Sequence, residues 1–157
     1  MRTSLLSVFV AMVAFPSCVW GFTQSPKDWQ IKSLKGISLI EYGVTKDPDN
    51  KLAKTLATEL GGTGVPLKSI NLKADSGTPL SKKEARLKVS VDDRENGQSW
   101  VGLYIQQKAD LNRDPSVTFE PETYGVGTLC PKSKVNETVK DLCVQFVHDF
   151  NSQKTPR

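Results

Sequence analysis

Histidine and cysteine are scarce in this chain of 157 residues, which contains one histidine, His148, and three cysteines. A closed zinc site takes four cysteine or histidine ligands at short spacings, and cysteine-held iron–sulfur clusters also take four ligands. The sequence cannot supply such a set, so it excludes zinc-finger and iron–sulfur proteins. We expect no metal site and no cofactor.

A strong charge of one sign is also lacking. Lysine and arginine number 21 against 17 aspartate and glutamate, for a net charge of +4. The basic residues are spread along the chain among acidic ones, whereas nucleic-acid-binding domains gather them into a patch or stripe. We therefore expect a solvated surface and no nucleic-acid partner. The balance of 38% hydrophobic and 24% charged residues is that of one soluble domain.

Motifs with a catalytic mechanism are absent as well. No serine lies in a Gly-x-Ser-x-Gly turn, and His148 lies beside an apolar helical stripe, which is typical of a surface histidine. The glycine-rich segment 61–64 follows a predicted helix, so it indicates helix termination; phosphate-binding loops precede their helix. Asp92, Asp93 and Glu95 lack the spacing of an EF-hand loop, and we interpret them as a solvated hairpin end.

Residues 1–21 have the pattern of a signal peptide, with Arg2, an apolar run from Leu5 to Phe15, and small residues near the end. The run is about half of the roughly 20 residues that a membrane-spanning helix needs. No later segment is apolar enough to span, so we expect no transmembrane segment in the mature chain.

Two processing sites compete at the end of this segment. One is cleavage after Gly21. The other is lipidation of Cys18, because Phe15-Pro16-Ser17-Cys18 resembles a degenerate bacterial lipobox, although Phe15 and Pro16 depart from the usual pattern. Either route predicts an exported protein, periplasmic or secreted, and lipidation would anchor it through Cys18.

Cys130 and Cys143 form a candidate disulfide, since paired cysteines in exported proteins are usually bridged. Against this, Cys143 lies about ten residues into a predicted helix, or ~15 Å along its axis. A disulfide needs Cα atoms within roughly 7 Å. Two small buried apolar residues are the alternative.

The chain divides into a polar leader (22–35), one domain (36–151) and a flexible tail (152–157). Within the domain, residues 37–44 predict a strand, and Asp49 or Asn50 caps a helix that ends at Gly61. Residues 65–72 predict an edge strand, and Asn96-Gly97 joins a hairpin of strands 87–91 and 100–111. A bent strand at 117–129 and a helix from Ser133 complete the chain.

The order of these elements is βαββββα. It predicts an α+β two-layer sandwich, in which a mainly antiparallel meander sheet of about five strands carries both helices on one face. Each predicted helix has a single apolar stripe, so each buries that stripe against the sheet.

Trp100 and Tyr104 share the polar face of the long strand, because strand side chains alternate with a period of two. Exposed aromatic residues on an open sheet face are typical of a binding surface for an envelope protein or a glycan. In the alternative interpretation, the leader around Phe22 and Trp29 covers them, or they stabilise cross-strand pairs.

Asn136-Glu137-Thr138 matches the acceptor pattern for N-glycosylation, which applies only in a eukaryotic host. A secreted eukaryotic glycoprotein is therefore a third hypothesis, and it predicts a glycan on Asn136.

Five short runs and the closing amphipathic helix define the layout of the mature chain. The runs are Leu34-Lys35-Gly36-Ile37, Leu87-Lys88-Val89-Ser90-Val91, Val101-Gly102-Leu103-Tyr104-Ile105, Leu111-Asn112-Arg113-Asp114 and Thr123-Tyr124-Gly125-Val126-Gly127. This layout resembles small exported bacterial proteins of unknown function, and it is also similar to envelope accessory lipoproteins that assist transport or assembly. Tyr124 departs from the pattern, since a tryptophan often stands there. The resemblance implies a periplasmic, non-enzymatic role.

The leading hypothesis is thus an exported, non-enzymatic binding or accessory protein of the cell envelope, with Trp100 and Tyr104 as its binding surface. The alternative is a small secreted hydrolase or ligand-binding enzyme that uses acids among Asp92, Asp93 and Glu122. The sequence does not set the oligomeric state.

Overall fold

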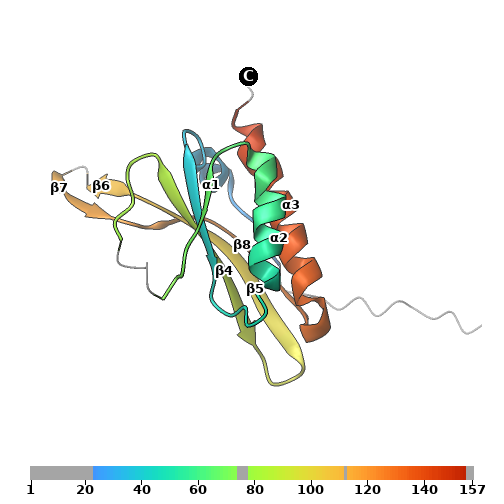
Figure 1. The fold of residues 1–157 in the computed structure, drawn as a ribbon. Helices are drawn as coiled ribbons and strands as arrows, with labels where there is room; N and C mark the ends of the chain where they lie inside the picture. Colours follow the sequence, from blue (N-terminus) through green and yellow to red (C-terminus); the bar gives the residue numbers. More distant parts are fainter. Residues whose placement is uncertain (1–22, 74–77, 112, 155–157) are drawn as a thin grey trace, which may run out of the picture.

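The computed structural model describes residues 23–73, 78–111 and 113–154. The candidate signal peptide, the lipidation candidate Cys18 and the leader residue Phe22 lie outside the described residues. The described chain forms one mixed sheet with helices packed on one of its faces (Figure 1). This α+β two-layer arrangement confirms the predicted fold class.

The main sheet has six strands in the order β1-β8-β5-β4-β2-β3. Their bounds are Thr23–Gln24 (β1), Leu39–Val44 (β2), Leu67–Ser69 (β3), Glu84–Asp93 (β4), Gln98–Gln107 (β5) and Glu122–Pro131 (β8). Strands β4, β5 and β8 form the predicted antiparallel meander, and β1 extends it at the edge of β8. Strand β2, in contrast, runs parallel to both β3 and β4. The helix between β2 and β3 returns the chain to the same end of the sheet, which makes that pair parallel.

Helix α2 (Lys51–Leu60) follows the predicted stripe, since Leu52, Leu56 and Leu60 are all buried. Its ends lie where the sequence predicts, with Asn50 as the N-cap residue and Gly61 as the C-cap residue, but the capping side chain is a different one. The carboxylate of Asp47 accepts the backbone N–H of Ala53 at 2.7 Å, whereas the N-cap residue Asn50 makes no side-chain cap and has φ 54°. Beyond Leu60 the chain continues into a 3-10 turn, Gly61–Thr63, and stops at Gly64, whose φ of 67° only glycine adopts readily.

Helix α3 (Val135–Ser152) packs beside α2 on the same face of the sheet (Figure 1). The predicted apolar stripe is confirmed, because the residues that face the sheet are buried: Val139, Leu142, Cys143, Phe146 and Phe150. They meet the buried side of β5, which consists of Val101, Leu103 and Ile105. The predicted alternation of β5 is therefore correct for its core face.

The segment interpreted as a polar leader has structure of its own. Strand β1 pairs with β8, and helix α1 (Asp28–Ser33) lies against the same strand. The Ser33 hydroxyl donates to the carbonyl of Thr123 at 3.1 Å, and Leu34, directly after the helix, is buried. This segment thus closes one edge of the domain.

The long strands predicted at 100–111 and 117–129 are each divided in two. Their outer parts form a separate two-stranded ribbon of β6 (Ala109–Leu111) and β7 (Asp114–Phe119), which projects from the main sheet (Figure 1). Pro121 lacks an N–H group for the ladder and lies where the second strand breaks. Val117 and Phe119 of the ribbon are exposed.

Candidate functional site

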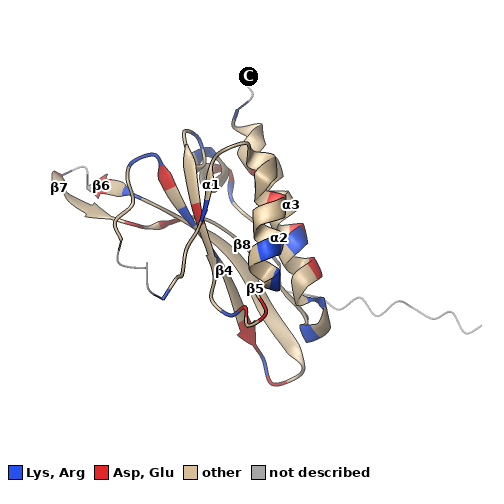
Figure 2. Cartoon of the chain, in the orientation of Figure 1, with Lys and Arg blue, Asp and Glu red and all other residues tan. Residues whose placement is uncertain are grey.

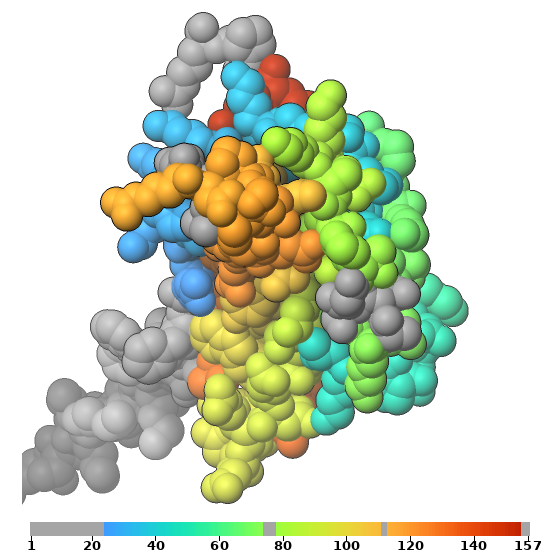
Figure 3. All heavy atoms as spheres, turned by 90° about the vertical axis from the view of Figure 1, so that its left-hand side faces the viewer, coloured from blue at the N-terminus to red at the C-terminus, as the bar shows by residue number. Residues whose placement is uncertain are grey.

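The outer face of the main sheet, opposite α2 and α3, is the face that the helices leave uncovered. Figure 3 shows it from the front: the β6–β7 ribbon, in orange, stands over its upper part, and β4 and β5 lie below. Along β5, Trp100, Gly102 and Tyr104 point to this side, while the buried residues between them point to the helices.

Trp100 and Tyr104 form a continuous aromatic surface over three glycines, which we name the aromatic platform. The indole N–H of Trp100 donates to the Tyr104 hydroxyl at 3.1 Å. A Cβ built on Gly102 would lie 2.3–2.5 Å from the hydroxyl, Cε2 and Cζ of Tyr104. One built on Gly127 would lie 2.5 Å from Cζ2 of Trp100, and one on Gly125 would lie 3.2 Å from Cδ1 of Tyr104. Both rings therefore rest on glycine backbone.

The Tyr104 ring lies along the sheet rather than standing on it. Opposite edges of the ring approach Gly102 on β5 and Gly125 on β8, so the ring bridges two strands with one face on the backbone. Aromatic cover of sheet glycines stabilises cross-strand packing. Trp100 and Tyr104 both remain partly exposed. Trp29, which was considered as a cover for them, is itself 57% exposed on α1.

Charged side chains border the aromatic platform on both sides. Lys88 of β4 is the cross-strand neighbour of Tyr104, and Asp92 is that of Trp100. On β8, a Glu122 carboxylate oxygen lies 3.2 Å from the Cβ position of Gly125. Partial burial raises the pKa of Glu122, and the nearby positive charge of Lys88 opposes this shift. The aromatic surface therefore has polar groups at its edges that can bind hydroxyl or charged groups of a ligand.

A buried ion cluster lies on the same face, and the sequence analysis missed it. Arg86, only 3% exposed, donates from Nη2 to Glu41 at 3.2 Å and from Nη1 to Glu120 at 3.3 Å. Lys68 donates to the other oxygen of Glu41 at 2.8 Å. Burial raises the pKa of Glu41, but hydrogen bonds and positive charge from Lys68 and Arg86 outweigh it and lower the pKa overall. No sequence signal indicates this cluster, because it depends on the parallel pairing of β2 with β4.

The ion cluster also holds the loop before β4 on the outer face. Arg86 donates to the carbonyl of Thr78 at 2.6 Å, and a Glu120 oxygen accepts the N–H of Leu80 at 2.7 Å. Leu80 is 2% exposed although it lies outside the main core cluster. Arg86 thus joins β4, the loop and the base of the ribbon.

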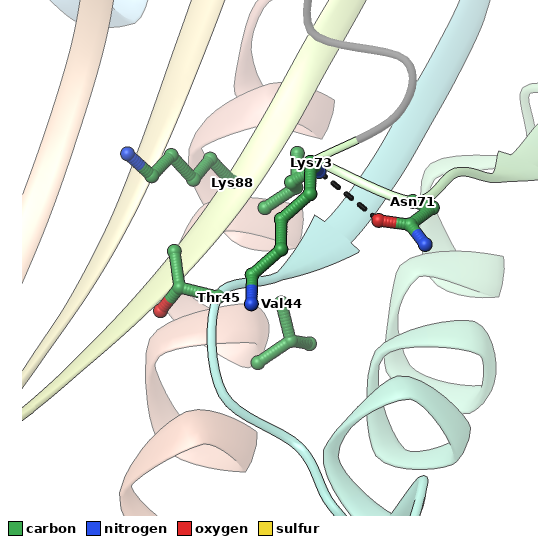
Figure 4. A pocket seen from close by; sticks show the side chains of 6 residues that line it. Val44, Thr45, Asn71, Lys73 and Lys88 are labelled. Carbon is green, nitrogen blue, oxygen red and sulfur yellow. Dashed lines mark hydrogen bonds between the residues drawn. The ribbon is translucent and has the colours of Figure 1, made fainter.

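A pocket of about 400 Å³ opens beside the platform, at the end of β2 and against the middle of β4 (Figure 4). Its lining residues are Val44, Thr45, Asn71, Leu72, Lys73 and Lys88. The chain after β3 forms one wall: Leu72 covers Gly43, where a Cβ would lie 2.7 Å from its Cγ, and the Asn71 side chain accepts the N–H of Lys73 at 3.0 Å. In Figure 4 the Lys73 side chain extends along the pocket toward Thr45, whereas the Lys88 side chain projects from the neighbouring strand away from Lys73.

The acids considered for catalysis are not brought together. Asp92 and Asp93 lie at the acidic end of β4 (Figure 2), whereas Glu122 pairs with Gln106 near the other end of β5. Hydrogen bonds from Lys46 and Ser99 lower the pKa of Asp93. Six residues of β5 separate the two ends, a distance of about 20 Å. A shared acid–base site is therefore not formed by these three residues.

Tyr124 is sealed in the core. Its hydroxyl donates to Asp149 of α3 at 2.9 Å, and its ring packs edge-on against Phe146 with centroids 5.4 Å apart. Burial, together with Asp149, raises the pKa of Tyr124. The neighbouring His148 has a side chain that is 81% exposed, with Nδ1 3.3 Å from Asp149. The Tyr124–Asp149 bond therefore joins the sheet to α3 and is closed to substrates.

Cys130 and Cys143 are both buried and both free in the structure, so the candidate disulfide is not formed. They lie in the main core cluster with the apolar residues of α3. Burial raises the pKa of Cys143 to about 12. The two residues therefore pack as small apolar side chains, which was the alternative interpretation.

Two further features concern metal and membrane. Within residues 23–73, 78–111 and 113–154, no group of three or more His, Cys, Asp or Glu side chains is placed to hold a metal ion. Among the helices of that same part, none combines the length and apolarity needed to cross a bilayer.

The candidate glycosylation residue, Asn136, is exposed in the first turn of α3. Its side-chain oxygen accepts a hydrogen bond from the Thr55 hydroxyl at 2.9 Å.

The sequence matches no protein-family model and no curated protein sequence. Among solved structures, two PelC dodecamers from Paraburkholderia phytofirmans are similar to this chain. One has a TM-score of 0.43 and 11% identity over 83% of this chain and 96% of the PelC chain. The other has a TM-score of 0.41 and 10% identity, over 83% of this chain and 95% of the PelC chain. A minor lipoprotein from Acinetobacter baumannii has a TM-score of 0.31 and 11% identity, over 76% of this chain and 96% of the lipoprotein chain. The similarity is one of loose layout, and it carries no information on a ligand.

Proposed function

We propose that this chain is an exported, non-enzymatic binding protein of the cell envelope and that it binds a glycan through the aromatic platform. The observation that carries the proposal is the position of the Trp100 and Tyr104 rings. They rest on the glycine backbone of β5 and β8, and both residues are partly exposed. A flat, rigid aromatic surface fits the apolar face of a sugar ring.

The surroundings of the platform support a glycan over an apolar partner. Lys88, Asp92 and Glu122 border the rings, and polar groups around a small aromatic surface fix the orientation of a hydroxyl-rich ligand. The two rings are held by the glycines and by the bond between Trp100 and Tyr104, so little side-chain freedom is lost on binding. The acids of the enzyme alternative lie apart, which favours binding without hydrolysis.

Replacing Trp100 and Tyr104 by serine tests the platform. We expect the affinity for a bound oligosaccharide to fall at least tenfold, equivalent to about 1.4 kcal/mol, because both stacking faces are lost. Uncovering the glycines should lower the free energy of unfolding by only about 1 kcal/mol. Calorimetric titration against a panel of oligosaccharides and urea denaturation measure the two effects.

Trp29→Ser is the matched control, since it removes an equally large exposed ring from α1 and should leave the affinity unchanged. If the platform variant bound oligosaccharides as tightly as the unmodified protein, the proposed surface would be wrong. The hydrolase alternative predicts a different result: the unmodified protein would release shorter sugars from the panel. Changing Asp92, Asp93 or Glu122 to the corresponding amide would then abolish this release.

The intact mass of the protein purified from its host tests export. Cleavage after Gly21 and lipidation of Cys18 give different masses, and a mass that retains residues 1–21 would contradict the export proposal. In the cleaved form we expect the folded protein to resist thiol alkylation, because Cys130 and Cys143 are buried and the pKa of Cys143 is raised to about 12. Unfolding should allow two alkyl groups to be added, whereas a bridged pair would accept none without reduction.

A further inference from the structure

A second pocket, of about 670 Å³, lies at the tip of the β4–β5 hairpin, and we name it the hairpin pocket. Its volume is in the range of sites that hold small ligands. In Figure 3 the hairpin tip forms the lower end of the outer face, at the opposite end from the β6–β7 ribbon. The lining residues are Asp93, Arg94, Glu95, Asn96, Gln98 and Leu129.

The hairpin pocket adjoins the aromatic platform. Gln98 precedes Trp100 by two residues on β5, so their side chains share one face of the strand. Leu129 of β8 is the cross-strand neighbour of Trp100, and such neighbours have Cβ atoms about 5 Å apart. The partly buried, apolar Leu129 therefore extends the platform toward the pocket. From Gln98 to Tyr104 the strand rises about 20 Å, so a chain of several sugar units can reach both, whereas a disaccharide cannot.

Two carboxamides of the hairpin pocket have groups that fit sugar hydroxyls. The Asn96 side-chain N–H donates to Oε1 of Gln98 at 3.1 Å. This bond leaves Oδ1 of Asn96 as an acceptor and Nε2 of Gln98 as a donor. Among the described residues, no hydrogen bond engages either of these two atoms. An acceptor and a donor held side by side match two neighbouring hydroxyl groups of a sugar, because a hydroxyl can both donate and accept.

The charges of the hairpin pocket favour an uncharged ligand. Asp93 is paired with Lys46. Arg94 and Glu95, which are adjacent in the chain, add one charge of each sign to the lining. A ligand with a charge of one sign is therefore attracted by one of these groups and repelled by the other, whereas a neutral glycan can form hydrogen bonds with both.

We infer that the hairpin pocket is a second subsite for the glycan, so that one chain lies along β5 from Tyr104 to the hairpin tip. This inference rests on the proposed glycan-binding function. It adds the class of the ligand, an uncharged oligosaccharide or polysaccharide of several units. It also assigns Asn96 and Gln98 as the residues that bind hydroxyl groups at the hairpin end of that chain.

Length series of neutral oligosaccharides, from the disaccharide to the octasaccharide, test the second subsite. The series are cello-, malto-, laminari- and chito-oligosaccharides. We expect the affinity of the unmodified protein to rise about tenfold with length and then level off, because only longer chains form hydrogen bonds in the hairpin pocket. The double variant Asn96→Ala and Gln98→Ala should lose this rise and keep the affinity for the disaccharide, which also shows that its platform is folded. Calorimetric titration measures both affinities.

The matched control is the double variant Asn136→Ala and Gln145→Ala, which removes two carboxamides from α3, on the other side of the sheet, and should keep the rise. A rise that persists without Asn96 and Gln98, or that is lost in both double variants, would overturn the assignment of the pocket. Equal affinity of the unmodified protein for all lengths would overturn this inference and leave the glycan proposal standing. Binding of no chain of any length would overturn both. Tighter binding of oligogalacturonate than of neutral chains of the same length would overturn the uncharged class of the ligand.

Discussion

Replacing Arg86 by methionine should lower the free energy of unfolding by about 3–5 kcal/mol, the usual cost of breaking a buried ion pair by removing one partner. Arg86 is 3% exposed and binds both Glu41 and Glu120, so the substitution leaves two carboxylates without their shared cation. It also releases the carbonyl of Thr78 and with it the loop on the outer face. Urea denaturation followed by circular dichroism measures the loss.

Lys82→Met is the matched control, because the side chain of Lys82 is 75% exposed in its ion pair with Asp110 and an exposed pair contributes about 0–1 kcal/mol. An equal, small loss in both variants would contradict the structural role of Arg86. The pH dependence gives a second readout. The pKa of Glu41 is lowered from its ordinary 4.5, so its contribution is present above that pH and is lost as the pH falls through the lowered value. The Arg86→Met variant should show less of this acid-induced loss.

Replacing Tyr124 by alanine should cost about 3–5 kcal/mol, as for other large aromatic side chains truncated in a core. Tyr124 is fully buried on β8, and its loss leaves a cavity against Phe146. Asp149, which is 9% exposed, also loses the hydrogen bond that the Tyr124 hydroxyl donates to its carboxylate. Thermal and urea denaturation of the variant measure the change.

Tyr124→Phe separates the two contributions, since it keeps the ring and removes only the hydroxyl. We expect a loss of about 1–3 kcal/mol, because a buried charged acceptor is left without its donor. If the phenylalanine variant were as stable as the unmodified protein, the Tyr124–Asp149 bond would not join the sheet to α3 as the geometry indicates. If the alanine variant lost no more than the phenylalanine variant, the ring would not be part of the core.

Local patterns predicted much of the fold correctly. The apolar spacing in α2 and α3 identified which side of each helix is buried, because that spacing follows from the helical period. The alternation along β5 placed Val101 and Leu103 in the core and Trp100 and Tyr104 on the other face, because strand side chains alternate. The cap and stop positions of α2, Asn50 and Gly61, were also predicted correctly. The side chain that caps the helix, Asp47, was not predicted, since a capping hydrogen bond depends on the path of the loop before the helix.

The candidate site was predictable only in part. The sequence pointed to Trp100 and Tyr104 but not to the glycines that hold their rings flat, because Gly125 and Gly127 lie on another strand and meet the rings through the β5–β8 register. It gave no indication of the pocket, which the segment after β3 completes by folding over Gly43. For Cys130 and Cys143 the sequence left both a disulfide and two buried free thiols open, and the packing of α3 on the sheet decided for the second.

The amino-acid sequence by itself determined the helical stripes, the hairpin and the face on which the two aromatic residues lie, since each follows from the period of one element. Only the tertiary structure decided that β2 and β3 are parallel, that Arg86 joins Glu41 to Glu120, and that Lys88 lies between Tyr104 and the pocket at the end of β2. These features join residues far apart in the chain, and their contacts are set by the order and register of strands. The scarcity of histidine and cysteine excluded zinc-finger and iron–sulfur proteins, and the packing of α2 and α3 then determined which face of the sheet the helices leave uncovered.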